Sequence, residues 1–198
     1  MESLRPSMVR KASPIQCIFF DCDNTICLSE SLASDASRDL LTEILGDFGG
    51  ISPAAQPALK HVLMDSAGRS LRSVLNVLRD RYPGILTAEK IDFYVDRELS
   101  LVTEKLKQEC QPCPGAPEQI AWAKNQGYRI AIVSSSAKTR LLASIEKIGV
   151  ASYFRHCDIF SAADSMEMPL GKPDPAVYNF ACQVGLLVSY FPYGSSLP

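Results

Sequence analysis

Three short apolar runs constrain the fold of this 198-residue chain more than any other feature. They lie at residues 15–20, 128–133 and 157–160. Short continuous apolar runs are typical of strands that are buried on both faces of a parallel sheet. A helical pattern at about 117–127 precedes the second run, and another at about 137–148 lies between the second and third runs. A last one runs from Asp174-Pro175 to about Val184. This alternation predicts right-handed crossovers and an α/β fold with a doubly wound parallel sheet.

A helical block separates the first run from the second. Ser29 is expected to cap its first helix, Pro53 to open a short second one, and residues 69–81 to form a third. Thr87 is expected to cap a long fourth helix, whose apolar positions have helical spacing. We therefore predict a mobile N-terminus at 1–14, an α/β core at 15–28 and 112–198, and an inserted helical cap at 29–111.

Polar residues follow each predicted strand. Asp21 and Asp23 come after the first, Ser134-Ser135-Ser136 after the second, and Lys172 follows the third within G-K-P-D-P. In a doubly wound sheet, ligands bind at the carboxyl ends of the strands. Two acids two residues apart can act as nucleophile and proton donor, and a hydroxyl and an ammonium suit a phosphoryl oxygen. Each residue alone has an ordinary explanation, a turn cap or a solvated surface group, but their shared position favours catalysis.

These residues resemble a known set of motifs. The segment 20–25, F-D-C-D-N-T, resembles the D-x-D-x-T signature of the haloacid dehalogenase-like (HAD) hydrolase superfamily. Val133-Ser134 is similar to its second motif and Lys172 to its third. The resemblance spans about residues 15–184 and is strongest to the β-phosphoglucomutase-like branch. It implies a Rossmann-like core with a helical cap inserted after the first motif.

The resemblance also implies a role for each residue. Asp21 would attack phosphorus and form an aspartyl-phosphate intermediate. Asp23 would protonate the leaving oxygen and later activate water. Ser134, with Ser135 beside it, would bind the phosphoryl group, and Lys172 would neutralise it. Mg²⁺ would be held by the Asp21 carboxylate, the Asp23 main-chain carbonyl and an acidic fourth motif.

The cap is expected to select the substrate. Gly68 and Arg69 resemble the cap loop that reaches the active site in this branch, although an exposed arginine is an equally good interpretation of Arg69. A small phosphorylated metabolite such as a sugar phosphate is the default substrate, with a lipid-like phosphate as an alternative. Dehalogenation is disfavoured, because relatives with that chemistry usually lack an acid at the position of Asp23.

Two departures from the family pattern stand out. Asn24 occupies a position that is usually Gly, which makes the turn less permissive. No Asp or Glu follows Asp174, so the acidic fourth motif is missing. The residues from 186 to 191 are apolar enough to pair beside the first strand, but they bring no acid. The abrupt change near Gly185 predicts a truncated or alternatively spliced product with weaker Mg²⁺ affinity.

Three hypotheses follow from this combination. The leading one is a Mg²⁺-dependent phosphatase, with a phosphomutase as a variant of the same chemistry. The second is a non-catalytic descendant that binds a phosphorylated ligand or a partner, and the third is an incomplete chain.

Composition excludes several other classes of partner. The net charge of −2 provides no basic field for nucleic acid, and no run approaches the ~18 apolar residues that would span a membrane. The C-x-x-C pair Cys110 and Cys113 has no second pair to complete a metal site, so a structural role is favoured over redox chemistry. Seven cysteines without a disulfide pattern, and no apolar leader segment, predict a cytoplasmic protein. The sequence leaves the oligomeric state open.

Overall fold

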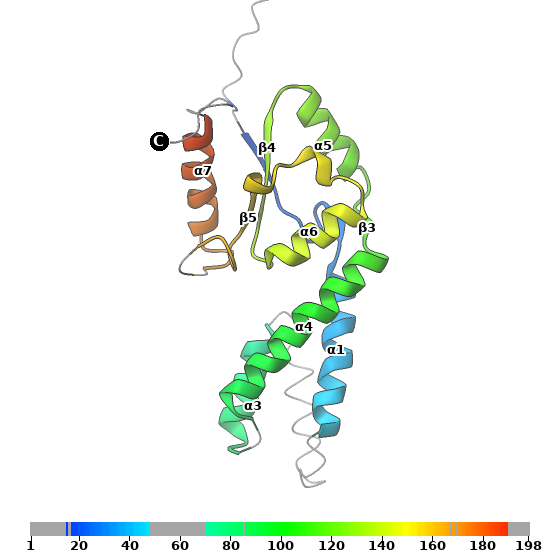
Figure 1. The fold of residues 1–198 in the computed structure, drawn as a ribbon, viewed down its shortest axis with the longest axis vertical. Coiled ribbons are helices and arrows are strands. Elements are labelled where there is room, and N and C mark those ends of the chain that lie inside the picture. Colours follow the sequence, from blue (N-terminus) through cyan, green and yellow to red (C-terminus); the bar gives the residue numbers. More distant parts are fainter. Residues whose placement is uncertain are drawn as a thin grey trace, which may run out of the picture.

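A parallel sheet forms the centre of the computed structural model, which describes residues 15, 17–47, 70–84, 86–166, 168 and 170–189. Its described strands have the order β1-β4-β5 (Figure 1). They are β1 (Cys17–Phe20), β4 (Arg129–Ser134) and β5 (Ile159–Ser161). Phe20 lies opposite Ile132, and Ile132 opposite Ile159. This register brings the carboxyl ends of the three strands to one edge of the sheet.

Helices cover both faces of the sheet. Ile130 and Ile132 of β4 belong to a buried cluster with residues of α5 (Ala116–Asn125) and α6 (Lys138–Lys147). The alternate residues Ala131 and Val133 pack instead with α7 (Ala176–Ser189). Figure 1 shows α7 on one side of the sheet and α5 and α6 on the other. This confirms the predicted doubly wound α/β fold.

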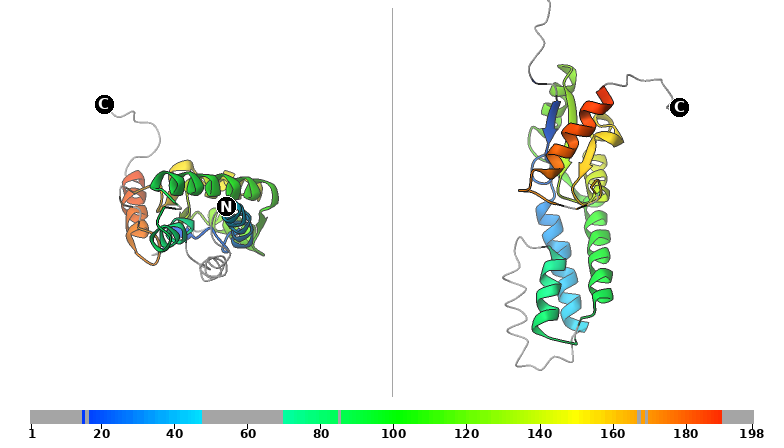
Figure 2. Two further views of the ribbon diagram at one scale, coloured as in Figure 1. Left: turned by 90° about the horizontal axis from the view of Figure 1, so that it is seen from below. Right: turned by 90° about the vertical axis from the view of Figure 1, so that its left-hand side faces the viewer.

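Three described helices form a cap beyond the carboxyl edge of the sheet (Figure 2). They are α1 (Glu30–Asp47), α3 (Leu71–Arg81) and α4 (Ala88–Glu109). As predicted, the Thr87 hydroxyl caps α4 by accepting a hydrogen bond from the Lys90 N–H at 3.3 Å. The cap has its own apolar core, which includes Leu40, Ile44, Leu75 and Ile91. None of the described helices combines the length and apolar character that a membrane crossing needs.

A short antiparallel pair, β2 (Cys27–Leu28) with β3 (Gln111–Pro112), carries the chain out to the cap and back. We call this pair the hinge. Val102 and Leu106 of α4 belong to the same buried cluster as Ile132 of the core. Packing is therefore continuous across the hinge, and the domain borders proposed from the sequence stay a prediction.

Two strands differ from expectation. β1 is only half-buried along its length, because it pairs with β4 alone among the described strands. The third strand begins at Ile159 and not at 157, since residues 156–158 form a 3₁₀ turn. Asp158, which is buried, accepts hydrogen bonds there from Arg129 at 3.1 Å and Arg155 at 2.9 Å. The charge of Asp158 is satisfied by these bonds, which hold the residue in the turn.

The last described helix is longer than predicted. α7 runs to Ser189, so residues 186–189 continue the helix and do not pair beside β1, although they are apolar enough to do so. Residues 190 and 191 of that stretch lie outside the described residues. The same holds for the helix expected at Pro53 and for the cap residues Gly68 and Arg69.

Candidate active site

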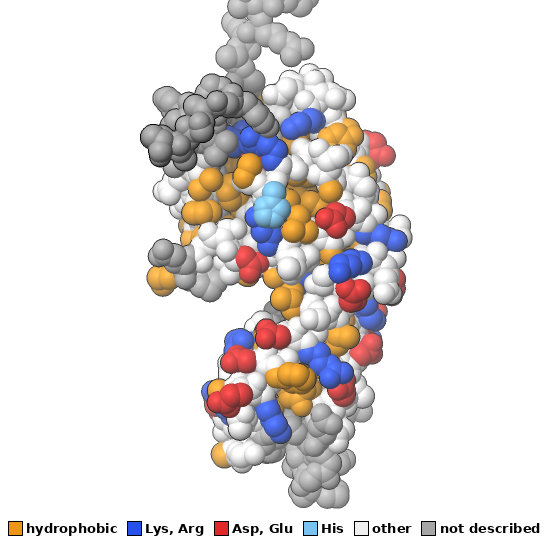
Figure 3. Space-filling model, viewed as in Figure 1, with side chains coloured by type: hydrophobic (Ala, Val, Ile, Leu, Met, Phe, Trp, Pro, Cys, Tyr) orange, Lys and Arg blue, Asp and Glu red, His pale blue; other side chains and the backbone are white. Residues whose placement is uncertain are grey.

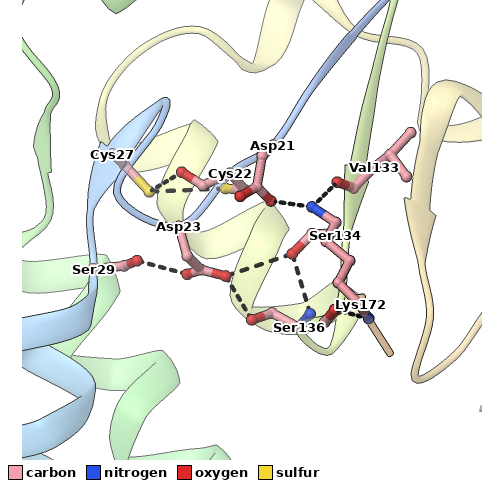
Figure 4. A network of polar contacts seen from close by, with 10 residues as sticks. Asp21, Cys22, Asp23, Cys27, Ser29, Val133, Ser134, Ser136 and Lys172 are labelled. Atoms are coloured by element: carbon pink, nitrogen blue, oxygen red, sulfur yellow. Dashed lines mark hydrogen bonds and ion pairs between the residues drawn. The ribbon is translucent and has the colours of Figure 1, made fainter. Parts of the chain in front are cut away.

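The predicted acids, hydroxyl and lysine meet at the carboxyl edge of the sheet, where it faces the cap (Figure 4). The space-filling view shows an indentation between the core and the cap on one side of the molecule (Figure 3). Lys172 Nζ lies 2.7 Å from Asp21 Oδ1, although 151 residues separate them in sequence. Lys172 therefore contacts the acid at the end of β1, as its place in the motif order predicts.

Three contacts hold Lys172 against Asp21. Its ammonium also donates to the Val133 carbonyl at 2.9 Å, and its main-chain N–H donates to the Ser135 hydroxyl at 2.9 Å. The aromatic ring of Tyr178 on α7 has its centroid 5.3 Å from Lys172 Nζ. Burial lowers the pKa of Lys172, but hydrogen bonds to Asp21 and Tyr178 outweigh it and leave the pKa above its ordinary value. The lysine is thus a fixed positive charge beside Asp21.

Asp23 has hydroxyl groups as its partners. Ser29 donates to Oδ1 at 2.6 Å, and Ser136 donates to Oδ2 at 2.6 Å, with Ser134 3.5 Å from the same oxygen. Ser29 precedes α1 at the hinge, whereas Ser134 and Ser136 belong to the loop after β4. The second acid is therefore held from both the core and the start of the cap (Figure 4).

The loop after β4 is itself supported from β5. Ser161, which is fully buried at the end of β5, donates to the Ser136 carbonyl at 2.8 Å. The Ser136 N–H donates to the Ser134 hydroxyl at 3.1 Å. Asp164 accepts a hydrogen bond from the Lys138 N–H at the start of α6. Because its backbone is bonded on two sides, the loop presents its hydroxyls at defined positions.

The turn that carries Asp23 depends on the two residues that flank it. The N–H groups of three successive residues, from Thr25 to Cys27, donate to the Cys22 carbonyl at 2.9–3.2 Å. Asn24 has a φ of 53°, the left-handed conformation in which asparagine is among the best tolerated non-glycine residues. Asn24 therefore fits the turn despite replacing the usual glycine.

The start of α1 differs from the prediction. The Asn24 side chain, and not Ser29, accepts a hydrogen bond from a free N–H of the helix, that of Glu30, at 3.3 Å. The Asn24 amide also donates to the Glu30 carboxylate. Only the main-chain carbonyl of Ser29 takes part in the helix, through the Ala33 N–H at 3.0 Å. The hydroxyl of Ser29 points instead toward Asp23, to which it donates at 2.6 Å (Figure 4).

Sequence reasoning identified part of this network and missed the rest. Asp21, Asp23, Ser134 and Lys172 are brought together, whereas the exposed Ser135 contacts the Lys172 backbone, so its role in phosphate binding stays a prediction. The contacts of Ser29, Ser136 and Tyr178 were not foreseen.

A metal ion such as Mg²⁺ would need oxygen ligands at this site. Asp21 Oδ1 is engaged by Lys172, which leaves Oδ2 of the half-exposed carboxylate for a metal. Within the described residues, no three His, Cys, Asp or Glu side chains cluster in a way that could hold a metal ion. Mg²⁺ keeps several waters and often takes only one or two protein carboxylates together with substrate phosphates. The Asp21 carboxylate therefore fits a hydrated Mg²⁺ site of this kind.

An ion-paired carboxylate beside a second acid, at the carboxyl edge of a doubly wound sheet, is an arrangement suited to group transfer. The family model for the haloacid dehalogenase-like hydrolases matches residues 15–184. The chain therefore belongs to the haloacid dehalogenase-like hydrolase family.

Named relatives and a solved structure agree with this assignment. Hexitol phosphatase B of Escherichia coli is 29% identical over 84% of this chain and 68% of its own length. Phosphoglycolate phosphatase of Neisseria meningitidis is 25% identical over 86% of this chain and 67% of its own length. The structure of a putative β-phosphoglucomutase from Thermotoga maritima matches the fold with a TM-score of 0.55 at 19% identity, covering 85% of this chain and 70% of that one. The chain thus spans about two thirds of the proteins to which it is similar.

Proposed function

We propose that this hydrolase is a Mg²⁺-dependent phosphatase that acts on a small phosphorylated metabolite through an aspartyl-phosphate intermediate. The observation that carries the proposal is the 2.7 Å ion pair between Asp21 and Lys172, with Asp23 two residues away. Both named relatives are phosphatases, which supports a phosphate ester as the substrate.

The first chemical step needs a nucleophile and an acid. An oxygen of the Asp21 carboxylate attacks phosphorus, the bond from phosphorus to the leaving oxygen breaks, and Asp23 gives its proton to that oxygen. Lys172 offsets the charge of the phosphoryl oxygens and holds Asp21 in place. Ser134 donates a hydrogen bond to the transferred group.

The second step reverses the role of Asp23. Its carboxylate takes a proton from water, the water oxygen attacks phosphorus, and the bond to Asp21 breaks to release inorganic phosphate. The Asp21 carboxylate and the Asp23 main-chain carbonyl would hold Mg²⁺, which supplies positive charge next to the phosphoryl oxygens when bound.

Two related functions use the same site. A phosphomutase would return the phosphoryl group to another position of the substrate and would need a bisphosphate primer. A non-catalytic descendant would bind the phosphate ligand without turnover. The hydroxyl contacts of Asp23 favour turnover over the non-catalytic descendant, because they hold an acid/base group ready beside the nucleophile. We also propose a cytoplasmic location, because all seven cysteines are free, as thiols are in a reducing compartment.

The test is Mg²⁺-stimulated release of inorganic phosphate from a panel of small monoesters, with phosphoglycolate and hexitol phosphates included because the relatives are named for them. We expect Asp21→Asn to lower the rate by at least ~10³-fold, since it removes the nucleophile. Asp80→Asn, the same chemical change at an exposed cap residue, is the matched control and should leave the rate unchanged.

Three results would contradict the proposal. They are equal rates for wild type and Asp21→Asn, binding of the esters without any phosphate release, and a primer-dependent isomer in place of free phosphate. The last two would establish the non-catalytic descendant and the mutase, respectively.

A further inference from the structure

Three buried thiols lie directly behind the acidic pair, and the proposed reaction uses none of them. Cys22 and Cys27 are 0% exposed and Cys110 is 2% exposed. Cys22 stands between Asp21 and Asp23, whereas Cys27 begins β2 and Cys110 precedes β3. The thiols therefore connect the catalytic turn to the two strands of the hinge.

Cys27 also hydrogen-bonds with Cys110, but the pair within the catalytic turn is Cys22 and Cys27. Their sulfur atoms are 3.8 Å apart (Figure 4). The Cys27 N–H donates to the Cys22 carbonyl at 3.2 Å, and the Cys27 thiol lies 3.7 Å from the same oxygen. The backbone thus folds the two residues onto each other across the turn. A disulfide bond is about 2.0 Å long, so the sulfurs need to approach by only roughly 1.8 Å.

We propose that Cys22 and Cys27 form a reversible disulfide that switches off the site. Hydrogen peroxide is the oxidant by class, because both thiols are 0% exposed and this burial excludes a larger oxidant. One thiol attacks a peroxide oxygen, which gives a sulfenic acid and one water. The second thiol attacks the sulfenic sulfur, forms the S–S bond and releases a second water. Peroxide gains the two electrons that the two thiols lose, and a dithiol reductant reverses the reaction.

The disulfide would close a ring around the residues that carry Asp23. Residues 23–26 lie inside that ring, and Cys22 is bonded on either side to the two acids. Drawing the sulfurs together therefore shifts the backbone that positions both carboxylates. A misplacement of about 1 Å in a catalytic group can cost about 10²-fold in rate. We expect a loss of that order on oxidation, and this expectation rests on the proposed phosphatase function.

The disulfide itself is tested by mass, independently of activity. The parent protein carries Cys157→Ser and Cys182→Ser, which remove the two exposed cysteines and their side reactions. After peroxide treatment the remaining free thiols are alkylated, and the protein is cleaved on the amino side of aspartate. Cleavage before Asp21, Asp23 and Asp35 separates Cys22 from Cys27. The expected product is the dipeptide 21–22 joined by a disulfide to the peptide 23–34.

Two mass results would overturn the disulfide. One is that Cys22 and Cys27 are both alkylated after oxidation, and the other is a link from Cys27 to Cys110 or from Cys110 to Cys113. The variant Cys27→Ser provides the second measurement and should retain its activity after peroxide treatment. If Cys27→Ser does not fold, the peptide map of the parent protein still decides the question.

The activity readout separates this proposal from the proposed function. A fall in phosphate release that a dithiol restores, in step with the linked peptide, supports the switch. A linked peptide with unchanged activity overturns it. A reduced protein that releases no phosphate from any ester refutes the phosphatase function, and the peptide map still tells whether the disulfide forms.

Discussion

The two acids of the site lie two residues apart, yet their surroundings differ in kind. Asp21 faces a cation, because Lys172 Nζ is 2.7 Å from its carboxylate. Among the described residues, the partners recorded for the Asp23 side chain are neutral hydroxyls, those of Ser29, Ser134 and Ser136. One acid is therefore held by charge and the other by groups that carry none.

This difference suits two distinct proton states. An ammonium has three donors and no acceptor, so it favours a carboxylate and cannot accept the hydrogen bond that a protonated acid donates. A serine hydroxyl rotates and can either donate to a carboxylate or accept from a carboxylic acid. The lysine beside Asp21 thus suits a carboxylate that acts as a nucleophile. The Asp23 side accommodates both forms, as a proposed acid and base requires.

Removal of the cation tests the Asp21 side and should give the largest effect. We expect Lys172→Met to lower the rate of phosphate release about 10²- to 10³-fold, as loss of one preorganised charge donor does elsewhere. Lys105→Met, at a cap lysine whose ion pair with Asp39 is 3.6 Å long, is the control and should change the rate little. A fall of less than threefold in Lys172→Met would show that the charge of Lys172 contributes little to the reaction at Asp21.

The titration of Lys172 tests the same side without a change of residue. The pKa of Lys172 is above its ordinary value of 10.5 in the folded protein, because its bonds to Asp21 and Tyr178 outweigh its burial. Stability that comes from this shift is present below pH 10.5 and is lost as the pH rises through the higher folded value. The difference in unfolding free energy between wild type and Lys172→Met should thus be constant from pH 8 to 10 and narrow above it.

Urea denaturation of both proteins at several pH values measures that difference. The rate of phosphate release should fall about tenfold per pH unit above the folded pKa of Lys172 as the ammonium is lost. If the difference in unfolding free energy narrows already between pH 8 and 10, a group other than Lys172 controls the ion pair with Asp21.

Substitution of a hydroxyl beside Asp23 should lower the rate less than Lys172→Met does, because each hydroxyl is one of several partners of Asp23. We expect Ser136→Ala to lower kcat about tenfold, near the lower end of what a hydrogen bond to a charged group contributes. The KM should change little if the hydroxyl acts on Asp23 and not on the substrate. Ser152→Ala, at an exposed serine in the 3₁₀ turn Ala151–Tyr153, is the control. An increase in KM at unchanged kcat would instead make Ser136 a substrate ligand.

Ser136 also shows where prediction from sequence stopped. The apolar run that ends at Phe20, followed by two acids, was enough to place both carboxylates at a strand end, since burial and chain order determine that edge. Lys172 was found through its G-K-P-D-P context. The direction of a hydroxyl in a loop depends on backbone angles that the residue types do not specify. Ser135 and Ser136 therefore could not be told apart beforehand.

The misplaced elements have the same origin. α7 extends to Ser189 because residues 186–188 are as compatible with a helix as with a strand, and a short apolar run does not distinguish the two. β5 begins two residues later than predicted because Asp158 forms two ion pairs. Its partner Arg129 is remote in sequence, and its partner Arg155 precedes the apolar run. Local patterns predicted which elements exist, whereas tertiary contacts determined where they begin and end.

Substitution of Ser29 should have the smallest effect on the rate, and it tests from which side Asp23 is held. It is the hydroxyl that reaches Asp23 from the start of the cap, at 2.6 Å from Oδ1, while Ser136 holds Oδ2 from the core. We expect Ser29→Ala to lower kcat only about threefold, because Ser136 still donates to the other oxygen of Asp23. Ser29→Thr retains the hydroxyl and should restore the rate, which a packing defect would not allow. If Ser29→Ala lowers kcat more than Ser136→Ala does, Asp23 is held chiefly from the hinge. The two acids would then differ in a second way, because Asp21 would be fixed to the core and Asp23 would move with the cap.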